Sequence, residues 1–100
     1  MLKQISLALI GVVVQTTTFA QVAGAPPSGR LLASNCFQCH GTNGKAVSGI
    51  EQLAGKSASE LKSELAEMKA QPQGRIMDVH AAAYTDAQIA AIAAYLSTVK

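Results

Sequence analysis

The sequence is poor in the large aromatic side chains that usually fill a protein core. It has no tryptophan, two tyrosines and two phenylalanines in 100 residues. The sequence also lacks a strong excess of either charge, since eight lysines and arginines are nearly balanced by six acidic residues. Because it has no basic run either, we expect no nucleic acid partner. No segment alternates between apolar and polar residues for long enough to predict a strand. A small helical protein is therefore expected, and a bound apolar cofactor would supply the core that the aromatics do not.

The first 20 residues predict a cleaved secretory signal peptide. Lys3 gives a positive start, residues 5–14 are almost uninterruptedly apolar, and a polar stretch leads to Ala20, which is the order of such a leader. We expect cleavage after Ala20, with Ala25 as the poorer alternative, and export to a periplasmic space. An uncleaved membrane anchor would need about 20 apolar residues. After cleavage, no remaining segment is long enough to span a membrane.

Removal of this leader lowers the share of apolar residues in the chain and leaves nearly all of its charges. The leader holds 12 of the 49 apolar residues and one of the 14 charges, which leaves 80 residues with a formal charge of +1. Residues 21–28 contain two prolines among small residues, a composition that favours an extended tether. Residues 29–100 are the predicted domain. So small a domain seldom gains a comfortable margin of stability from side chains alone.

Three segments of the mature chain predict helices. The first covers about 29–39, the second begins at a capping box over 57–60 and ends at Pro72, and the third opens at a capping box over 85–88. The fold class is therefore all-α, with three main helices and long loops that need something to organise them. The loops, marked by glycine and proline, cover residues 45–56 and run from 71 to about 84.

Both cysteines lie in one motif, Cys36-Phe37-Gln38-Cys39-His40, which is the C-x-x-C-H pattern of covalent c-type haem attachment. Two cysteines three apart on a helix project from the same face. Their sulfurs can therefore add to the two vinyl groups on one side of a porphyrin. His40 follows directly, so its ring can turn under the macrocycle and bind the iron. The motif predicts one haem c, joined to Cys36 and Cys39, with His40 as an axial ligand.

Other interpretations of these cysteines fit less well. A disulfide between Cys36 and Cys39 would close a loop too small to stabilise much. A thioredoxin-like redox pair would need a βαβ context, which the helical pattern lacks. A zinc site that adds His40 and His80 would require the neighbouring residues Cys39 and His40 to bind one ion, outside the usual ligand spacings. The motif thus favours haem, and the predicted export agrees with it.

Three stretches give the mature chain a resemblance to the class I c-type cytochromes. They are residues 32–41 (LASNCFQCHG), 50–55 (IEQLAG) and 77–95. Within that family the chain resembles the small haem subunits of flavocytochrome c sulfide dehydrogenases and the cytochromes of the c553 kind. The resemblance implies a small cytochrome c fold of three main helices and loops wrapped around one covalently bound haem.

One departure from the family concerns the histidine ligand. The family usually has proline where this chain has Glu51, and that proline helps to orient the histidine through a backbone carbonyl. A carbonyl of Gly49, Ile50 or Glu51 is expected to accept the hydrogen bond of His40 instead and to tune the electron density of the iron. The sequence leaves the choice among the three open.

Met77 is the second axial ligand that the resemblance implies. It precedes Tyr84 by seven residues, as the ligating methionine of the family precedes the aromatic that leads into the last helix. A Met/His pair raises the reduction potential in cytochromes c. Two residues remain as alternatives, Met68 in the apolar stripe of the second helix and His80 three residues after Met77. An iron with an open sixth site is the third possibility.

The expected function is periplasmic transport of single electrons, without catalytic residues of its own. An iron with two strong axial ligands has no vacancy for substrate, so outer-sphere transfer follows. The resemblance implies a haem subunit of a sulfide-oxidising flavocytochrome c, with an FAD-containing sulfide dehydrogenase subunit as partner. A free c553-like carrier to a terminal oxidase or another reductase is the alternative. A haem sensor or peroxidase with an open site is a different class that CO binding would reveal.

Overall fold

The computed structural model describes residues 10–15 and 26–100. Residues 10–15 are exposed and form neither helix nor strand. The predicted leader over 1–20, its cleavage after Ala20 and most of the tether over 21–28 lie outside the described residues, so these remain predictions. Within the two described ranges, no helix has the length and apolar character needed to cross a membrane.

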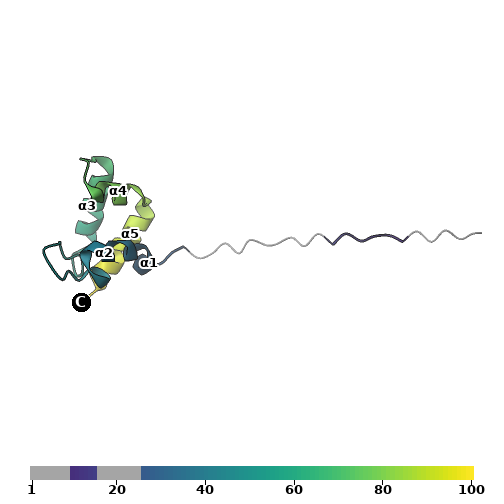
Figure 1. The fold of residues 1–100 in the computed structure, drawn as a ribbon, viewed down its shortest axis with the longest axis horizontal. Helices are drawn as coiled ribbons and strands as arrows, with labels where there is room; N and C mark the ends of the chain where they lie inside the picture. The colour runs from purple at the N-terminus through teal and green to yellow at the C-terminus, as the bar shows by residue number, and fades with distance from the viewer. Residues whose placement is uncertain (1–9, 16–25) are drawn as a thin grey trace, which may run out of the picture.

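The described part of the chain is helical and has no strand (Figure 1), which confirms the predicted all-α class. The first predicted helix is present as three short consecutive pieces, and the other two predicted helices are continuous. A further helix lies between them. In chain order the elements are α1 (Gly29–Ala33), η1 (Ser34–Cys36), α2 (Phe37–His40), η2 (Thr42–Gly44), α3 (Ala58–Ala70), α4 (Ile76–Ala82) and α5 (Asp86–Thr98).

Helix α4 corrects the sequence analysis, which predicted a loop from 71 to about 84. The helix begins after Arg75, whose backbone is extended. The Asp78 carboxylate accepts hydrogen bonds from the backbone N–H groups of Gln73 and Arg75 at the start of the helix. Most capping boxes pair Ser or Thr with Glu or Gln. The pair at the start of α4, Arg75 and Asp78, does not match that pattern, so the sequence contains no recognisable signal for the helix. The predicted loop from 71 to about 84 was therefore wrong over Ile76–Ala82.

Helices α1 and α5 cross where α1 has no room for a side chain. A Cβ atom on Gly29 would collide with the backbone carbonyl of Ala91 and lie 3.0 Å from the Cβ of Tyr95. Glycine at this position therefore lets the two helices touch. Helix α5 also packs against α3, and α3 packs against α4, so the four helices form a continuous chain of contacts from α1 to α4.

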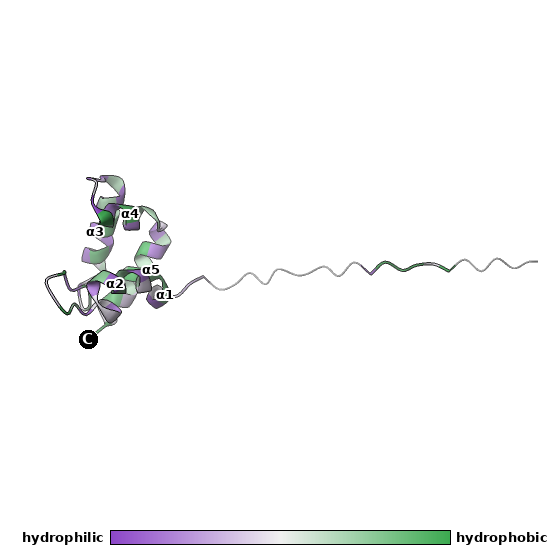
Figure 2. Ribbon diagram, in the orientation of Figure 1, coloured by the Kyte–Doolittle hydropathy of each residue, from purple (hydrophilic) through white to green (hydrophobic). Residues whose placement is uncertain are grey.

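The core between these helices is small. Among the described residues, the large side chains that are fully buried all come from α5: Ile89, Ile92 and Leu96. Apolar side chains also occur outside the core, on the loop between η2 and α3 and at the beginning of α4 (Figure 2). The exposed examples there are Val47, Ile50, Ile76 and Val79. The expectation of a core short of large residues agrees with this arrangement. The buried cluster around α5 consists of Ala33, Leu53, Leu61, Ile92, Ala93 and Leu96.

Candidate haem-binding site

The C-x-x-C-H motif lies in helical backbone directly after α1. Cys36 ends η1, and Cys39 and His40 lie in α2. Gly41 ends α2 with a φ of 84°, a value that favours glycine, and a Cβ there would collide with the carbonyl of Lys45. The chain can thus turn sharply after the histidine and return along the motif.

Cys36 and Cys39 are not joined to each other, so the rival disulfide is not formed. Cys36 is half-buried and Cys39 is exposed. Burial raises the pKa of the Cys36 thiol above its ordinary value. Over residues 10–15 and 26–100, no three His, Cys, Asp or Glu side chains gather closely enough to hold a metal ion by themselves. The rival zinc site with His80 is therefore not assembled.

His40 is oriented by a backbone carbonyl, and that carbonyl belongs to Glu51. The distance from His40 Nδ1 to Glu51 O is 2.7 Å. A carbonyl oxygen only accepts hydrogen bonds, so Nδ1 carries the proton and donates it. In a neutral imidazole with this tautomer, Nε2 carries the lone pair that binds a metal. Of the three carbonyls that the sequence left open, Glu51 is the one that accepts.

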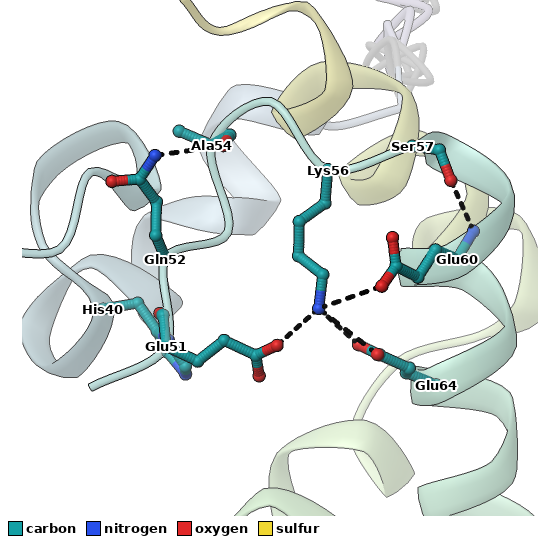
Figure 3. A network of polar contacts seen from close by, with 8 residues as sticks. All are labelled: His40, Glu51, Gln52, Ala54, Lys56, Ser57, Glu60 and Glu64. Atoms are coloured by element: carbon teal, nitrogen blue, oxygen red, sulfur yellow. Dashed lines mark hydrogen bonds and ion pairs between the residues drawn. The ribbon is translucent and has the colours of Figure 1, made fainter. Parts of the chain in front are cut away.

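The side chain of Glu51 takes part in a second interaction. Its Oε1 lies 2.5 Å from Nζ of Lys56, which also lies 3.1 Å from Glu64 and 3.6 Å from Glu60 (Figure 3). Hydrogen bonds to the carboxylates, first that of Glu51, raise the pKa of Lys56 above its ordinary range. The lysine is therefore charged at every pH at which the fold is expected to function. The sequence analysis missed this cluster, because Glu51 and Lys56 lie in a loop whose path it did not predict.

Met77 faces the motif across two adjoining hollows, and Cys36, His40 and Met77 line both. We call the one walled mainly by core side chains the inner hollow, and the one at the surface the outer hollow. The inner hollow is also lined by Glu51, Leu53, Leu61, Glu64, Leu65, Met68, Ile92 and Leu96. The outer hollow is also lined by Asn35, Cys39, Ile50, Ile76 and His80.

The alternative ligands each reach only one of these hollows. Met68, half-buried on α3, lines the inner hollow, and His80, exposed on α4, lines the outer one. Met77 is half-buried in the first turn of α4. The donor set fits haem: an imidazole with a free nitrogen and a thioether share a space with a cysteine of the attachment motif, and apolar side chains form its walls.

Asp78 holds the turn that leads to Met77. It is the buried charged residue of the described chain, with 4% of its surface exposed. Its Oδ2 accepts from the N–H of Gln73 at 2.7 Å and from the N–H of Arg75 at 2.9 Å, and Nη2 of Arg75 donates to Oδ1 at 2.8 Å. The Arg75 guanidinium, followed by these backbone donors, lowers the pKa of Asp78 to about 2. The i, i+3 spacing of Arg75 and Asp78 was the available sequence signal.

Tyr84 fixes the other end of the Met77 segment. Its hydroxyl donates to the carbonyl of Leu32 at 3.1 Å and accepts from Nδ2 of Asn35 at 3.0 Å. Its own carbonyl accepts from Nζ of Lys69 at 2.8 Å. The residue seven positions after Met77 thus joins the chain just after α4 to α1 and η1 on one side and to α3 on the other.

The comparisons with known proteins agree with this geometry. The chain is 35% identical over 68 residues to the cytochrome subunit of sulfide dehydrogenase from Chlorobaculum tepidum, an alignment that covers 67% of this chain and 62% of that relative. The chain thus matches less than two thirds of the relative's length. The sequence profile of the cytochrome c family matches residues 28–100. Since that match includes the attachment motif and every helix described above, the chain belongs to the cytochrome c family, as a class I c-type cytochrome that binds haem c covalently.

Proposed function

We propose that this cytochrome carries single electrons with its haem attached to Cys36 and Cys39 and the iron held between His40 and Met77. The observation that carries the proposal is the 2.7 Å hydrogen bond from His40 to the Glu51 carbonyl, which leaves Nε2 free beside the hollows that Met77 also lines. When bound, haem supplies a one-electron Fe(III)/Fe(II) couple. With His40 and Met77 as protein ligands, the iron would have no position for a substrate, so the chemistry it would supply is outer-sphere electron transfer.

Each protein group has a defined task in that reaction. The Glu51 carbonyl increases the basicity of His40 through Nδ1–H and fixes the plane of the ring. The thioether of Met77 favours the reduced iron and raises the reduction potential. Core side chains, Leu61 on α3 and Ile92 and Leu96 on α5 among them, line the inner hollow and exclude water from it. The outer hollow, with exposed Ile50 and Ile76, is the side on which a redox partner would approach.

Carbon monoxide tests whether the iron is closed. The reduced wild-type protein should not bind CO rapidly at neutral pH, because Met77 occupies the sixth position. Met77→Ala should bind it rapidly, and Met68→Ala, the matched methionine control on the inner hollow, should behave as wild type. Rapid CO binding by the wild-type protein would instead favour the sensor or peroxidase class.

We also propose that the protein is exported and acts as the haem subunit of a sulfide-oxidising flavocytochrome c. The leader pattern over residues 1–20 supports export, and the similarity to a subunit of sulfide dehydrogenase supports the partner. The partner would be an FAD-containing sulfide dehydrogenase subunit. A free c553-like carrier is the second candidate, because the family profile matches a cytochrome c domain over residues 28–100, and such a domain needs no flavoprotein partner to carry an electron.

Purification from the native periplasm distinguishes these two roles. Recovery of the cytochrome, beginning at Gln21, with a stoichiometric FAD protein would support the subunit role. A cytochrome recovered alone, without flavin, would support the free carrier. Recovery from the cytoplasm with residues 1–20 still attached would contradict the proposed export.

A further inference from the structure

We infer that Lys56 is a positioning residue for the histidine ligand: it holds Glu51 against α3 and thereby fixes the backbone carbonyl that accepts the His40 hydrogen bond. This inference rests on the proposed role of His40 as an iron ligand. It adds a residue outside the motif, Lys56, that controls the geometry of the ligand without touching it.

Glu51 connects the two interactions because it takes part in both. Its backbone oxygen accepts from His40 Nδ1 at 2.7 Å, and its side-chain Oε1 lies 2.5 Å from Lys56 Nζ. The carbonyl and the carboxylate belong to one residue, so a restraint on the side chain limits rotation of the adjacent peptide groups. Figure 3 shows His40, Glu51 and Lys56 in this order, from the motif toward α3.

Lys56 ties Glu51 to a rigid element. Its Nζ donates to both carboxylate oxygens of Glu64, at 3.2 and 3.1 Å, and lies 3.6 Å from Glu60 (Figure 3). Both glutamates lie in α3, which is fixed in the core by Leu61. Only 15% of the Lys56 side chain is exposed, whereas 59% of Glu51 and 40% of Glu64 are, so solvent screens each pair in part and the restraint comes from several carboxylates around one half-buried cation.

The loop itself gives Glu51 little support. Val47 is 93% exposed and Ile50 is 48% exposed, so the residues before Glu51 are not packed into the core. After it, the N–H groups of Leu53 and Ala54 donate to the carbonyl of Gly44. Glu51 also lacks the fixed φ that a proline would have at this position. The ion pair to Lys56 therefore supplies the restraint that the residue type does not.

The direct measurement is the exchange rate of the His40 Nδ1–H proton, followed by NMR in the reduced, haem-loaded protein. In Lys56→Met this proton should exchange with solvent at least about tenfold faster than in wild type, because the carbonyl is no longer held. Lys56→Arg, which keeps the cation, should restore slow exchange. Lys62→Met is the charge-matched control, since Lys62 is exposed on α3 and has no ion pair among the described residues.

The reduction potential distinguishes the loss of a positioned hydrogen bond from the loss of a positive charge, because these two changes shift the potential in opposite directions. Loss of a positive charge near the iron lowers the potential. A weaker hydrogen bond to His40 makes the imidazole a poorer donor to Fe(III) and raises it. Both effects operate in Lys56→Met, and under the inference the hydrogen-bond effect is the larger, so the potential of Lys56→Met should be higher than that of Lys62→Met. A lower potential together with unchanged proton exchange would overturn the inference.

A second variant keeps the test decisive if Lys56→Met does not fold. Glu51→Ala retains the backbone carbonyl, removes an exposed carboxylate and should also speed the exchange of the His40 proton. Slow exchange in a folded Glu51→Ala protein would overturn the inference. Failure of the proposed ligation looks different: the wild-type protein would then lack the strongly shifted ring signals of an iron-bound His40.

Discussion

Removing the hydroxyl of Tyr84 should destabilise the protein where the chain after α4 meets α1 and η1. In Tyr84→Phe the ring stays, and two hydrogen bonds are lost, to the carbonyl of Leu32 at 3.1 Å and from Nδ2 of Asn35 at 3.0 Å. A neutral hydrogen bond contributes about 0.5–1.5 kcal/mol net. Asn35 is exposed and regains water, whereas Leu32 is half-buried. The free energy of unfolding should fall by about 1–2 kcal/mol.

Urea unfolding of the haem-loaded protein at pH 7, followed by far-UV circular dichroism, measures this loss. For a domain of this size, about 1 kcal/mol corresponds to a shift in melting temperature of about 4–8 °C. Tyr95→Phe is the matched control, because it removes one bond, to Oδ1 of Asn43 at 2.8 Å, and should cost about 1 kcal/mol. A Tyr84→Phe protein as stable as wild type, with an unchanged denaturant slope, would refute the reasoning.

Three further predictions concern the helix crossing, the Met77 turn and the cofactor. Gly29→Ala should cost about 1–3 kcal/mol in thermal melts, since its Cβ would meet the Ala91 carbonyl; an unchanged melting temperature would contradict the crossing. Asp78→Asn should melt below wild type at pH 7. In the folded protein the pKa of Asp78 is lowered from 3.8 to about 2. The extra stability of the wild type over Asp78→Asn should therefore be complete above pH 3.8 and disappear as the pH falls through about 2. A stability difference that stays constant over this pH range would contradict the role of the Asp78 charge. The Cys36→Ala, Cys39→Ala protein, which holds no covalent haem, should be largely unfolded by circular dichroism, and a cooperative melt would show otherwise.

The helices that could be predicted from the sequence are those whose first turn is capped by residues three positions apart in the chain. Thr85 accepts from the N–H of Gln88, and Gln88 accepts from the N–H of Thr85, as the sequence pattern indicates. At α3, Ser57 caps the N–H of Glu60, but the Glu60 carboxylate lies near Lys56 instead of completing the box. A local motif predicts where the helix begins, whereas a competing charge elsewhere in the chain decides what its side chains contact.

The same distinction separates the predictable part of the site from the rest. The attachment motif occupies five consecutive residues, so its chemistry can be inferred from the sequence. The choice of the Glu51 carbonyl could not be inferred, because it depends on how the loop over 45–56 lies against α3. Asp78 was missed because its importance comes from burial at a helix start, which its short-range pattern does not reveal.

The ligands of the iron are the central claim, and the weak long-wavelength charge-transfer band of a methionine-bound ferric haem tests it most directly. The wild-type ferric protein should show the band, Met77→Ala should lose it, and Met68→Ala should keep it. Persistence of the band in Met77→Ala together with its loss in Met68→Ala would contradict the account, because the ligand would then come from α3.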